Sequence, residues 1–282
     1  MPEGHTVHRL ANAFGAQFVG KHVEASSPQG RFREGAALLD GRKLCAAEAK
    51  GKQMFLEFSD HEWLRVHLGL YGMWRFAGAG LAGIGRRTAK REDDAPFPPP
   101  PRGLVRLRLL AGPHVADLSG PTACEILSPG EKDAAMAKLG DDPLRDDADP
   151  ARAFGKIHGS RSAIGLLLMR QDIVAGIGNI YRAELLFRAR MEPHKAGRDL
   201  TPGQWEAMWA DLAELLRDGV KTGRIITTLK ADRPRGRGGV GRGAASYVAH
   251  RAKLPCRLCG TPVSAEEMAG RTLYWCSVCQ TQ

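Results

Sequence analysis

The sequence predicts an α+β protein of several domains: a β-sandwich behind one leading helix, a helical middle part and a small zinc-binding tail. Three observations predict this class. Short segments of alternating polar and apolar residues fill positions 23–118, apolar residues recur at helical spacing from 164 to 216, and two Cys-x2-Cys pairs lie near the carboxyl end. With 282 residues the chain is long enough for about two domains.

The leading helix is predicted from its apolar stripe. Five apolar residues recur at helical spacing, with polar residues between them: Val7, Leu10, Ala11, Phe14 and Phe18. Gly20 follows this stripe and is expected to end the helix.

The β-sandwich is predicted from short segments that follow the leading helix. Four of them have the texture of strands: Gln53–Phe58, Trp63–Leu68, Leu104–Leu109 and Val115–Leu118. Residues 77–103 interrupt them with glycine, alanine and four consecutive prolines. Because strand texture resumes afterwards, we expect a long exposed loop inside the β domain rather than a domain boundary.

The back half is predicted to be helical. Residues 164–169 are apolar on nearly every face, and a turn at 175–179 precedes a helix over 180–190. Thr201 caps a further helix, with Pro202 at its first position. The acidic stretch 131–149 is expected to be a solvated connection. We therefore place domains at 1–128, 129–245 and 246–282.

The charge of the chain favours a polyanionic partner. Its net charge is +10, and nine basic residues against one acid lie between positions 221 and 253, around a glycine-rich loop at 230–245. No run reaches the roughly 18 apolar residues of a membrane span, and the first ten residues do not resemble a secretory signal. We expect a monomeric, cytoplasmic, nucleoid-associated protein that binds nucleic acid and no membrane.

The cysteine quartet is the most specific motif. Its two pairs are separated by 16 residues, a spacing typical of zinc ribbons: Cys256, Cys259, Cys276 and Cys279. Four thiolates close a tetrahedral site and leave no position for water, so one structural Zn²⁺ is expected. The other two cysteines, Cys45 and Cys124, are expected in the core.

The amino terminus offers a reactive group. Removal of Met1 leaves Pro2 with a free secondary amine, which can attack C1′ of a deoxyribose and form an iminium ion. Glu3 is one residue away and can act as a general acid. Taken alone, this pair is weak evidence, because any chain can begin with Met-Pro.

Further candidates each have an ordinary alternative. Lys52 binds a phosphate or is a surface lysine, and Leu70 with Tyr71 either packs in the core or fills the space left by an extruded nucleotide. Arg271, on the hairpin between the cysteine pairs, binds phosphates or is a solvated charge. Asn179 lies at a helix amino terminus, where backbone N–H groups bind phosphate well.

These motifs occur together in a fixed order. In chain order they are Met1-Pro2-Glu3-Gly4, Gly51-Lys52, Leu70-Tyr71-Gly72, Asp142-Pro143-Leu144, Gly176-Ile177-Gly178-Asn179-Ile180-Tyr181, and the tail Cys256–Gln280 with Gly270-Arg271. With this set the chain resembles the formamidopyrimidine-DNA glycosylase and endonuclease VIII family over nearly its full length, in particular endonuclease VIII of actinobacterial type. The resemblance implies a β-sandwich, a helix–two-turn–helix domain and a zinc finger, with damaged DNA bound across the cleft between them.

The resemblance also implies residue roles. Pro2 would be the Schiff-base nucleophile and Glu3 the general acid. Lys52 and Arg271 would serve both catalysis and DNA binding, and with Asn179 they would hold the phosphates that flank the flipped nucleotide. Leu70 and Tyr71 would form the wedge. The chain has His5-Thr6 where many relatives have Pro-Glu, and Gly69 where they have a longer wedge residue.

The activity implied is that of a base-excision-repair DNA glycosylase with AP lyase activity. It would excise oxidised bases, pyrimidines first, and then cut the strand by β- and δ-elimination. Two alternatives are open: a glycosylase that prefers oxidised purines such as 8-oxoguanine, and a non-catalytic zinc-ribbon protein that binds nucleic acid through charge.

Overall fold

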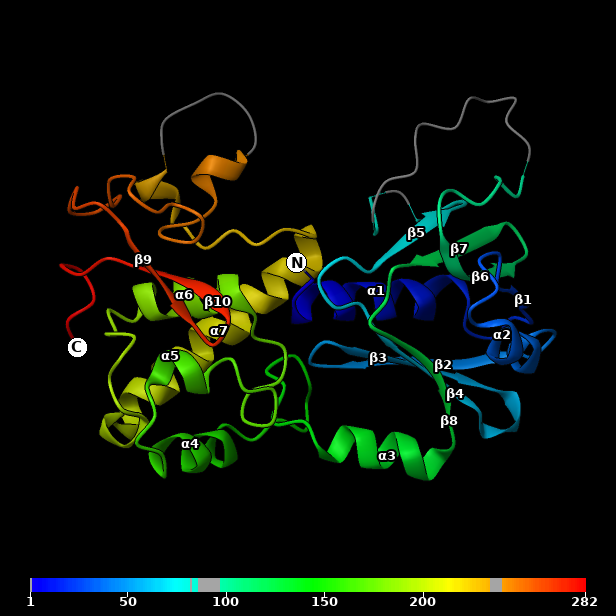
Figure 1. The fold of residues 1–282 in the computed structure, drawn as a ribbon, viewed down its shortest axis with the longest axis horizontal. Coiled ribbons are helices and arrows are strands. Elements are labelled where there is room, and N and C mark those ends of the chain that lie inside the picture. Colours follow the sequence, from blue (N-terminus) through cyan, green and yellow to red (C-terminus); the bar gives the residue numbers. More distant parts are fainter. Residues whose placement is uncertain (1, 82, 86–96, 234–239) are drawn as a thin grey trace. The chain divides into compact units, whose positions relative to one another are not determined.

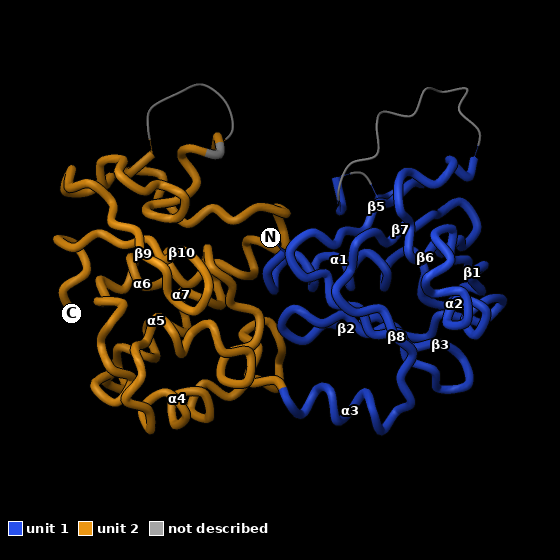
Figure 2. Tube along the Cα trace, in the orientation of Figure 1, with its two compact units in different colours: residues 1–138 blue, residues 139–282 orange. Residues whose placement is uncertain are grey.

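The protein is built from two compact units. The computed structural model describes residues 2–81, 83–85, 97–233 and 240–282, and its units are Met1–Lys138 and Leu139–Gln282 (Figure 2). Much of the loop predicted at 77–103 and much of the basic loop at 230–245, including Arg235 and Arg237, lie outside the described residues. Among the described residues, no helix is long and apolar enough to span a membrane.

Unit 1 is the predicted β-sandwich with a leading helix (Figure 1). Its elements are α1 (Gly4–Gln17), β1 (Glu24–Ser26), α2 (Arg33–Leu39), β2 (Leu44–Lys50), β3 (Gln53–Phe58), η1 (Ser59–His61), β4 (Trp63–His67), β5 (Met73–Ala77), β6 (Val105–Ala111), β7 (His114–Ser119), β8 (Ala123–Leu127) and α3 (Pro129–Ala137). The strands form two antiparallel four-stranded sheets, in the orders β1-β6-β7-β5 and β2-β3-β4-β8.

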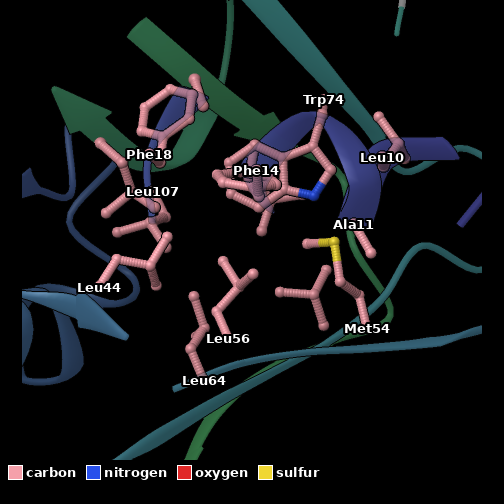
Figure 3. Close-up of a cluster of buried hydrophobic side chains, with 14 of the residues drawn as sticks. Leu10, Ala11, Phe14, Phe18, Leu44, Met54, Leu56, Leu64, Trp74 and Leu107 are labelled. Atoms are coloured by element: carbon pink, nitrogen blue, oxygen red, sulfur yellow. The ribbon is translucent and has the colours of Figure 1, made fainter. Parts of the chain in front are cut away.

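Helix α1 and both sheets share one apolar core, shown in Figure 3. The predicted stripe is buried, and the ring of Phe14 lies 4.9 Å from that of Trp74 and 5.0 Å from that of Phe18. Edge-to-face and tilted ring contacts of this kind add to the stability that burial of apolar surface provides. The helix ends at Gln17, and Gly20 follows with a φ of 87°, as a chain reversal requires. This core fixes the position of the amino terminus against the sheets.

Unit 2 combines helices with a two-stranded sheet. Its elements are α4 (Pro150–His158), α5 (Ile164–Leu167), α6 (Asn179–Arg188), η2 (Gly197–Asp199), α7 (Pro202–Thr222), η3 (Lys230–Asp232), η4 (Arg242–Ala244), β9 (Ser264–Met268) and β10 (Arg271–Trp275). Thr201 and Gln204 form a capping box at the start of α7, with Pro202 at the first helical position. The helix expected at 164–169 is only the four-residue α5.

Part of the acidic stretch is not the solvated connection that the sequence suggested, although Glu131, Asp133, Asp146 and Asp147 are exposed. Lys132 of α3 pairs with Glu48 at 2.7 Å. In unit 2, Asp141 and Asp142 are buried: Asp141 accepts from the Arg152 guanidinium at 2.6 Å, and Asp142 accepts from the Leu144 backbone N–H at 2.9 Å. These carboxylates stabilise folded structure, because buried charge persists only where it is paired or hydrogen-bonded. The expectation is therefore wrong for these two aspartates.

The β9–β10 hairpin packs against helix α6. Its two-residue turn, Ala269-Gly270, has positive φ at both positions, 57° and 65°, the geometry that matches the twist of a tight hairpin. Beneath it, Ala183 and Phe187 of α6 form a small core with Cys256, Val263, Cys276 and neighbouring residues. Of the two cysteines expected in the core, Cys45 is exposed, so that prediction is wrong, and Cys124 is half-buried.

Candidate active site and nucleic-acid interface

The first residues of the chain are held by helix α1. Glu3 is the N-cap of this helix and has no exposed surface, while Pro2 beside it is half-buried. The Glu3 carbonyl accepts from the Thr6 backbone N–H at 2.9 Å. Glutamate is almost never fully buried unless it is paired, and a buried carboxylate at the positive end of a helix is well suited to acid–base chemistry.

His5, in the first turn of α1, is also buried. Burial and then the positive charge of Arg9 lower the pKa of His5 to about 4. The imidazole is therefore neutral at pH 7. The Nε2 atom lies 3.1 Å from the Thr6 hydroxyl. The surroundings of Pro2 thus contain a carboxyl group and an uncharged imidazole on the same helical turn.

Lys52 lies at the turn between β2 and β3. Gly51 before it has a φ of 59°, and Gln53 after it pairs with His67 at the end of β4. The pKa of His67 is lowered by burial and then by the charge of Lys52. The connection between β4 and β5 starts directly after His67, so it leaves the sheet at the same end as Lys52. Figure 1 shows that the amino end of α1 lies at this end of unit 1 as well.

That connection carries Leu70 and Tyr71, which are 43% and 81% exposed. Core packing, the alternative for this pair, is excluded. Gly69 has a φ of 64°, and a Cβ there would lie 1.8 Å from the Thr122 hydroxyl oxygen. A longer wedge residue at position 69 does not fit this backbone. The two exposed side chains are therefore what the connection offers to a partner.

In unit 2, Asn179 begins helix α6 and is buried. Its side-chain amide nitrogen donates to the Thr272 carbonyl at 2.8 Å, and its oxygen accepts from the Arg182 guanidinium at 2.5 Å. An amide nitrogen has two hydrogens, so one is committed to Thr272. The phosphate-binding role of Asn179 stays a prediction.

Arg271 is the first residue of β10, directly after the hairpin turn. Its side chain is exposed, and one guanidinium nitrogen donates to the Gly270 carbonyl at 2.8 Å. Each guanidinium has five N–H groups, so most of its donors stay available for a phosphate. The two-residue turn therefore places an exposed cation at the tip of the hairpin.

The four predicted zinc ligands lie together. The Sγ atoms of Cys256, Cys259, Cys276 and Cys279 are within 4.8 Å of one another, and two of the separations are 3.9 and 3.4 Å. A tetrahedral Zn–S₄ centre with bonds of about 2.3 Å places its sulfurs about 3.8 Å apart. The residues therefore fit one structural Zn²⁺.

Gln280 secures the second cysteine pair. Its side-chain oxygen accepts from the Cys276 backbone N–H at 2.9 Å, and its amide nitrogen donates to the Met191 carbonyl at 2.9 Å. This buried amide joins the metal-binding knuckle to the segment that follows helix α6. A hydrogen bond to the backbone of a metal-ligating residue helps to orient that ligand.

Each unit carries part of the predicted residue set. Unit 1 holds Pro2, Glu3, Lys52, Leu70 and Tyr71, and unit 2 holds Asn179, Arg271 and the four cysteines. Sequence reasoning missed Arg182, Glu184 and Gln280, which are buried and polar. Two charged residues within the apolar stretch 180–187 were the available signal for the first two.

The sequence matches three families of known domains. Residues 1–115 match the formamidopyrimidine-DNA glycosylase N-terminal domain, residues 139–231 its H2TH (helix–two-turn–helix) domain, and residues 253–282 the zinc finger found in FPG and IleRS. Endonuclease 8 1 of Mycobacterium tuberculosis is 41% identical over 291 aligned residues that cover 100% of both chains. Formamidopyrimidine-DNA glycosylase of Bordetella pertussis is 31% identical over 252 residues, covering 86% of this chain and 84% of the relative.

Solved structures agree with the fold. The MutM (Fpg) protein of Thermus thermophilus has a TM-score of 0.75 at 26% identity and covers 99% of this chain and 98% of its own. Lactococcus lactis Fpg in complex with DNA that contains N7-benzyl-Fapy-dG has a TM-score of 0.75 at 22% identity, with 100% of both chains covered. The predicted α+β class, with its sandwich, helix–two-turn–helix domain and zinc finger, is confirmed.

Proposed function

Since the chain belongs to the formamidopyrimidine-DNA glycosylase and endonuclease VIII family of bifunctional DNA glycosylase/AP lyases in base excision repair, we propose that it excises oxidised bases, pyrimidines first, through a Schiff base on Pro2. The partner is damaged DNA, bound by a monomer, and the expected location is the cytoplasm at the nucleoid. The functional division at 1–128, 129–245 and 246–282 belongs to the same proposal.

One observation carries the proposal: the exposed residues Leu70 and Tyr71 stand on the connection that leaves the sheet at the Lys52 end. The amino end of α1 lies at the same end of unit 1 (Figure 1). Leu70 and Tyr71 are adjacent, and neighbouring exposed apolar side chains favour an interaction surface where a single one, such as Leu104, does not. An enzyme that extrudes a nucleotide needs apolar side chains to fill the vacated stack, next to a cation for the phosphate and a nucleophile for the sugar. Unit 1 offers all three within one region of its surface.

In the proposed mechanism the Pro2 nitrogen, freed by removal of Met1, attacks C1′ of the extruded nucleotide. The C1′–N bond to the base breaks, and its electron pair leaves with the base, which takes up the proton that the Pro2 nitrogen loses. Glu3 donates a proton to O4′ as the C1′–O4′ bond breaks, and the Pro2 lone pair completes the C1′=N double bond. The product is an iminium ion that acidifies the C2′ proton. Loss of that proton expels the 3′ phosphate, and a second elimination expels the 5′ phosphate.

The phosphates on either side of the lesion are assigned to Lys52, Asn179 and Arg271. The exposed guanidinium of Arg271 and the helix amino terminus at Asn179 support this assignment, because both are favourable phosphate ligands. The zinc ion has no role in the chemistry proposed here. Four thiolates complete its coordination and hold the hairpin that carries Arg271.

Borohydride trapping tests the mechanism. Reduction of the iminium ion should link the protein covalently to DNA that contains an abasic site. Pro2→Gly should abolish or strongly weaken this adduct, and Glu3→Gln should slow base release. A Pro2→Gly, Glu3→Gln double variant that still cuts abasic DNA at the full rate would falsify the mechanism.

The substrate preference requires a separate measurement. Single-turnover excision should be faster for thymine glycol and dihydrouracil than for 8-oxoguanine in otherwise identical duplexes. Faster removal of 8-oxoguanine would establish the purine alternative and leave the Schiff-base mechanism intact. Absence of both excision and trapping, with DNA binding retained, would establish the non-catalytic alternative.

A further inference from the structure

A buried arginine joins the two proposed phosphate-binding groups of unit 2. Arg182 of helix α6 has no exposed surface. Its guanidinium donates to the side-chain oxygen of Asn179 at 2.5 Å, to the Met268 carbonyl at 3.2 Å and to the Gly165 carbonyl at 3.4 Å. One planar fork thus reaches the start of α6, the end of β9 and helix α5.

The guanidinium fixes which way the Asn179 amide points. Arg182 can only donate, so the amide oxygen of Asn179 must face it and the amide nitrogen must face the opposite way. That nitrogen donates to the Thr272 carbonyl at 2.8 Å. With Arg182 replaced by a side chain that does not donate, the amide would lose the contact that determines its orientation.

Arg182 and Asn179 together hold the β9–β10 hairpin on both sides of its tip. Met268 is the last residue of β9 and pairs with Arg271, and Thr272 follows Arg271 in β10. Arg182 holds the first strand through Met268, and Asn179 holds the second through Thr272. The backbone that carries Arg271 is therefore attached to helix α6 on either side of the turn.

We propose that Arg182 is a positioning residue for the glycosylase/lyase reaction: it orients the Asn179 amide and the Arg271 tip toward the same DNA backbone. The inference rests on the phosphate-binding roles proposed for Asn179 and Arg271. Arginine is required because its rigid fork makes several hydrogen bonds in one plane, whereas the lysine ammonium is a point charge on a flexible stem.

The test measures whether Arg182 acts through Arg271. Binding to a duplex that contains a tetrahydrofuran abasic analogue is titrated for Arg182→Met, Arg182→Lys, Arg271→Ala and the Arg182→Met, Arg271→Ala double variant. Zinc content and thermal unfolding are measured for each. Arg182→Met should weaken binding about tenfold with one zinc retained, and Arg182→Lys should weaken it nearly as much. In the Arg271→Ala background, Arg182→Met should have a smaller effect, because only the Asn179 amide is then left for Arg182 to position.

Arg188 provides the matched control. It lies on the same helix and pairs with Asp211 at 2.5 Å, and it donates to the Thr227 carbonyl. Arg188→Met removes a partly buried arginine of α6 that makes no contact with the hairpin tip among those described. It should lower thermal stability while binding of the abasic duplex stays within about twofold of the wild type.

Three results would overturn the inference. Fully multiplicative effects of Arg182→Met and Arg271→Ala would show that the two residues act independently. Loss of zinc in both Arg182→Met and Arg182→Lys would assign Arg182 to the fold of the zinc module alone. Unchanged binding by Arg271→Ala would remove the proposed role of Arg271 as well. Borohydride trapping through Pro2 is scored separately, so a failure of the catalytic mechanism is distinguishable from each of these.

Discussion

At the scale of single residues, Tyr71 offers the most direct test of the wedge. Its side chain is 81% exposed, so it contributes little to the core of unit 1. Stacking of an aromatic ring on a base is worth about 1–3 kcal/mol by alanine substitution. Tyr71→Ala is expected to weaken binding of abasic duplex by roughly tenfold or more, with no change in the thermal unfolding midpoint.

Leu104 is the control for this substitution. It is a large apolar residue of the same unit and is 72% exposed, but it precedes β6 and lies outside the connection between β4 and β5. Leu104→Ala should leave DNA binding unchanged. Equal affinities for Tyr71→Ala and Leu104→Ala, in a fluorescence anisotropy titration, would count against the wedge.

The lowered pKa of the buried His5 leads us to expect a loss of folding stability in acid. Because burial and the charge of Arg9 lower its pKa to about 4, the unfolded chain binds a proton between pH 6.5 and about 4 that the folded chain does not. Stability therefore falls as the pH falls through that window, by about 3 kcal/mol from this residue. Urea unfolding at pH 7 and pH 4 should show a smaller loss for His5→Gln than for the wild type. Equal losses in the two proteins would contradict the burial of a neutral imidazole.

At the scale of elements, a clamp of one histidine and two glutamates attaches strand β9 to the segment that follows α6. The imidazole of His194 contacts Glu192 at 2.5 Å through one nitrogen and Glu266 of β9 through the other. Partial burial opposes the charged imidazole, but the two hydrogen bonds outweigh it and raise the pKa of His194 above its usual value.

Since this pKa is raised on folding, the clamp contributes its full stability below pH 6.5 and loses it as the pH rises through the folded-state pKa. Hydrogen exchange of the β9–β10 amides, corrected for its intrinsic pH dependence, should accelerate as the pH rises above the folded-state pKa of His194. His194→Gln should remove this transition. A wild-type hairpin whose protection is independent of pH between 6 and 9 would contradict the clamp.

The elements also show what the sequence could predict. Strand texture located β3, β4, β6 and β7 within one or two residues, since short runs rich in apolar residues and bounded by turn residues are typical of strands. The helix N-cap at Thr201 could be predicted because it depends on neighbouring residues alone. Helix α5 came out shorter than its apolar run, because tertiary packing can bury a short apolar segment in any conformation.

The buried polar residues were missed for a different reason. Arg182 and Glu184 stand in a helix where the usual expectation is an exposed face. Both are buried because most of their hydrogen-bond partners are far away in the chain: Arg182 donates to the Met268 carbonyl at 3.2 Å, and Glu184 accepts from the N–H groups of Val248 and Ala249 at 2.8 and 2.7 Å. Local sequence carries no record of such partners. The motif residues Asn179 and Arg271 were found, but the arginine that connects them was not.

At the scale of the whole molecule, the proposal requires that both units contact one DNA. The net charge of +10 favours such a complex, and its salt dependence can be apportioned to residues. Each cation that neutralises a phosphate lowers the slope of log K against log salt by about 0.9. With roughly four such contacts the wild-type slope of log K against log salt should be about −3.6.

Substitution of Lys52 in unit 1 and of Arg271 in unit 2 tests whether both units bind phosphates of the same DNA. Lys52→Ala and Arg271→Ala should each reduce the magnitude of the slope by about 0.9, and the double variant by about 1.8. Lys43→Ala is the control: Lys43 is an exposed cation that precedes β2, whereas Lys52 follows it, so the two lie at opposite ends of one strand. If the double variant loses no more slope than one single variant, only one unit binds the phosphates, and a mechanism that needs Pro2 and Arg271 on the same lesion fails.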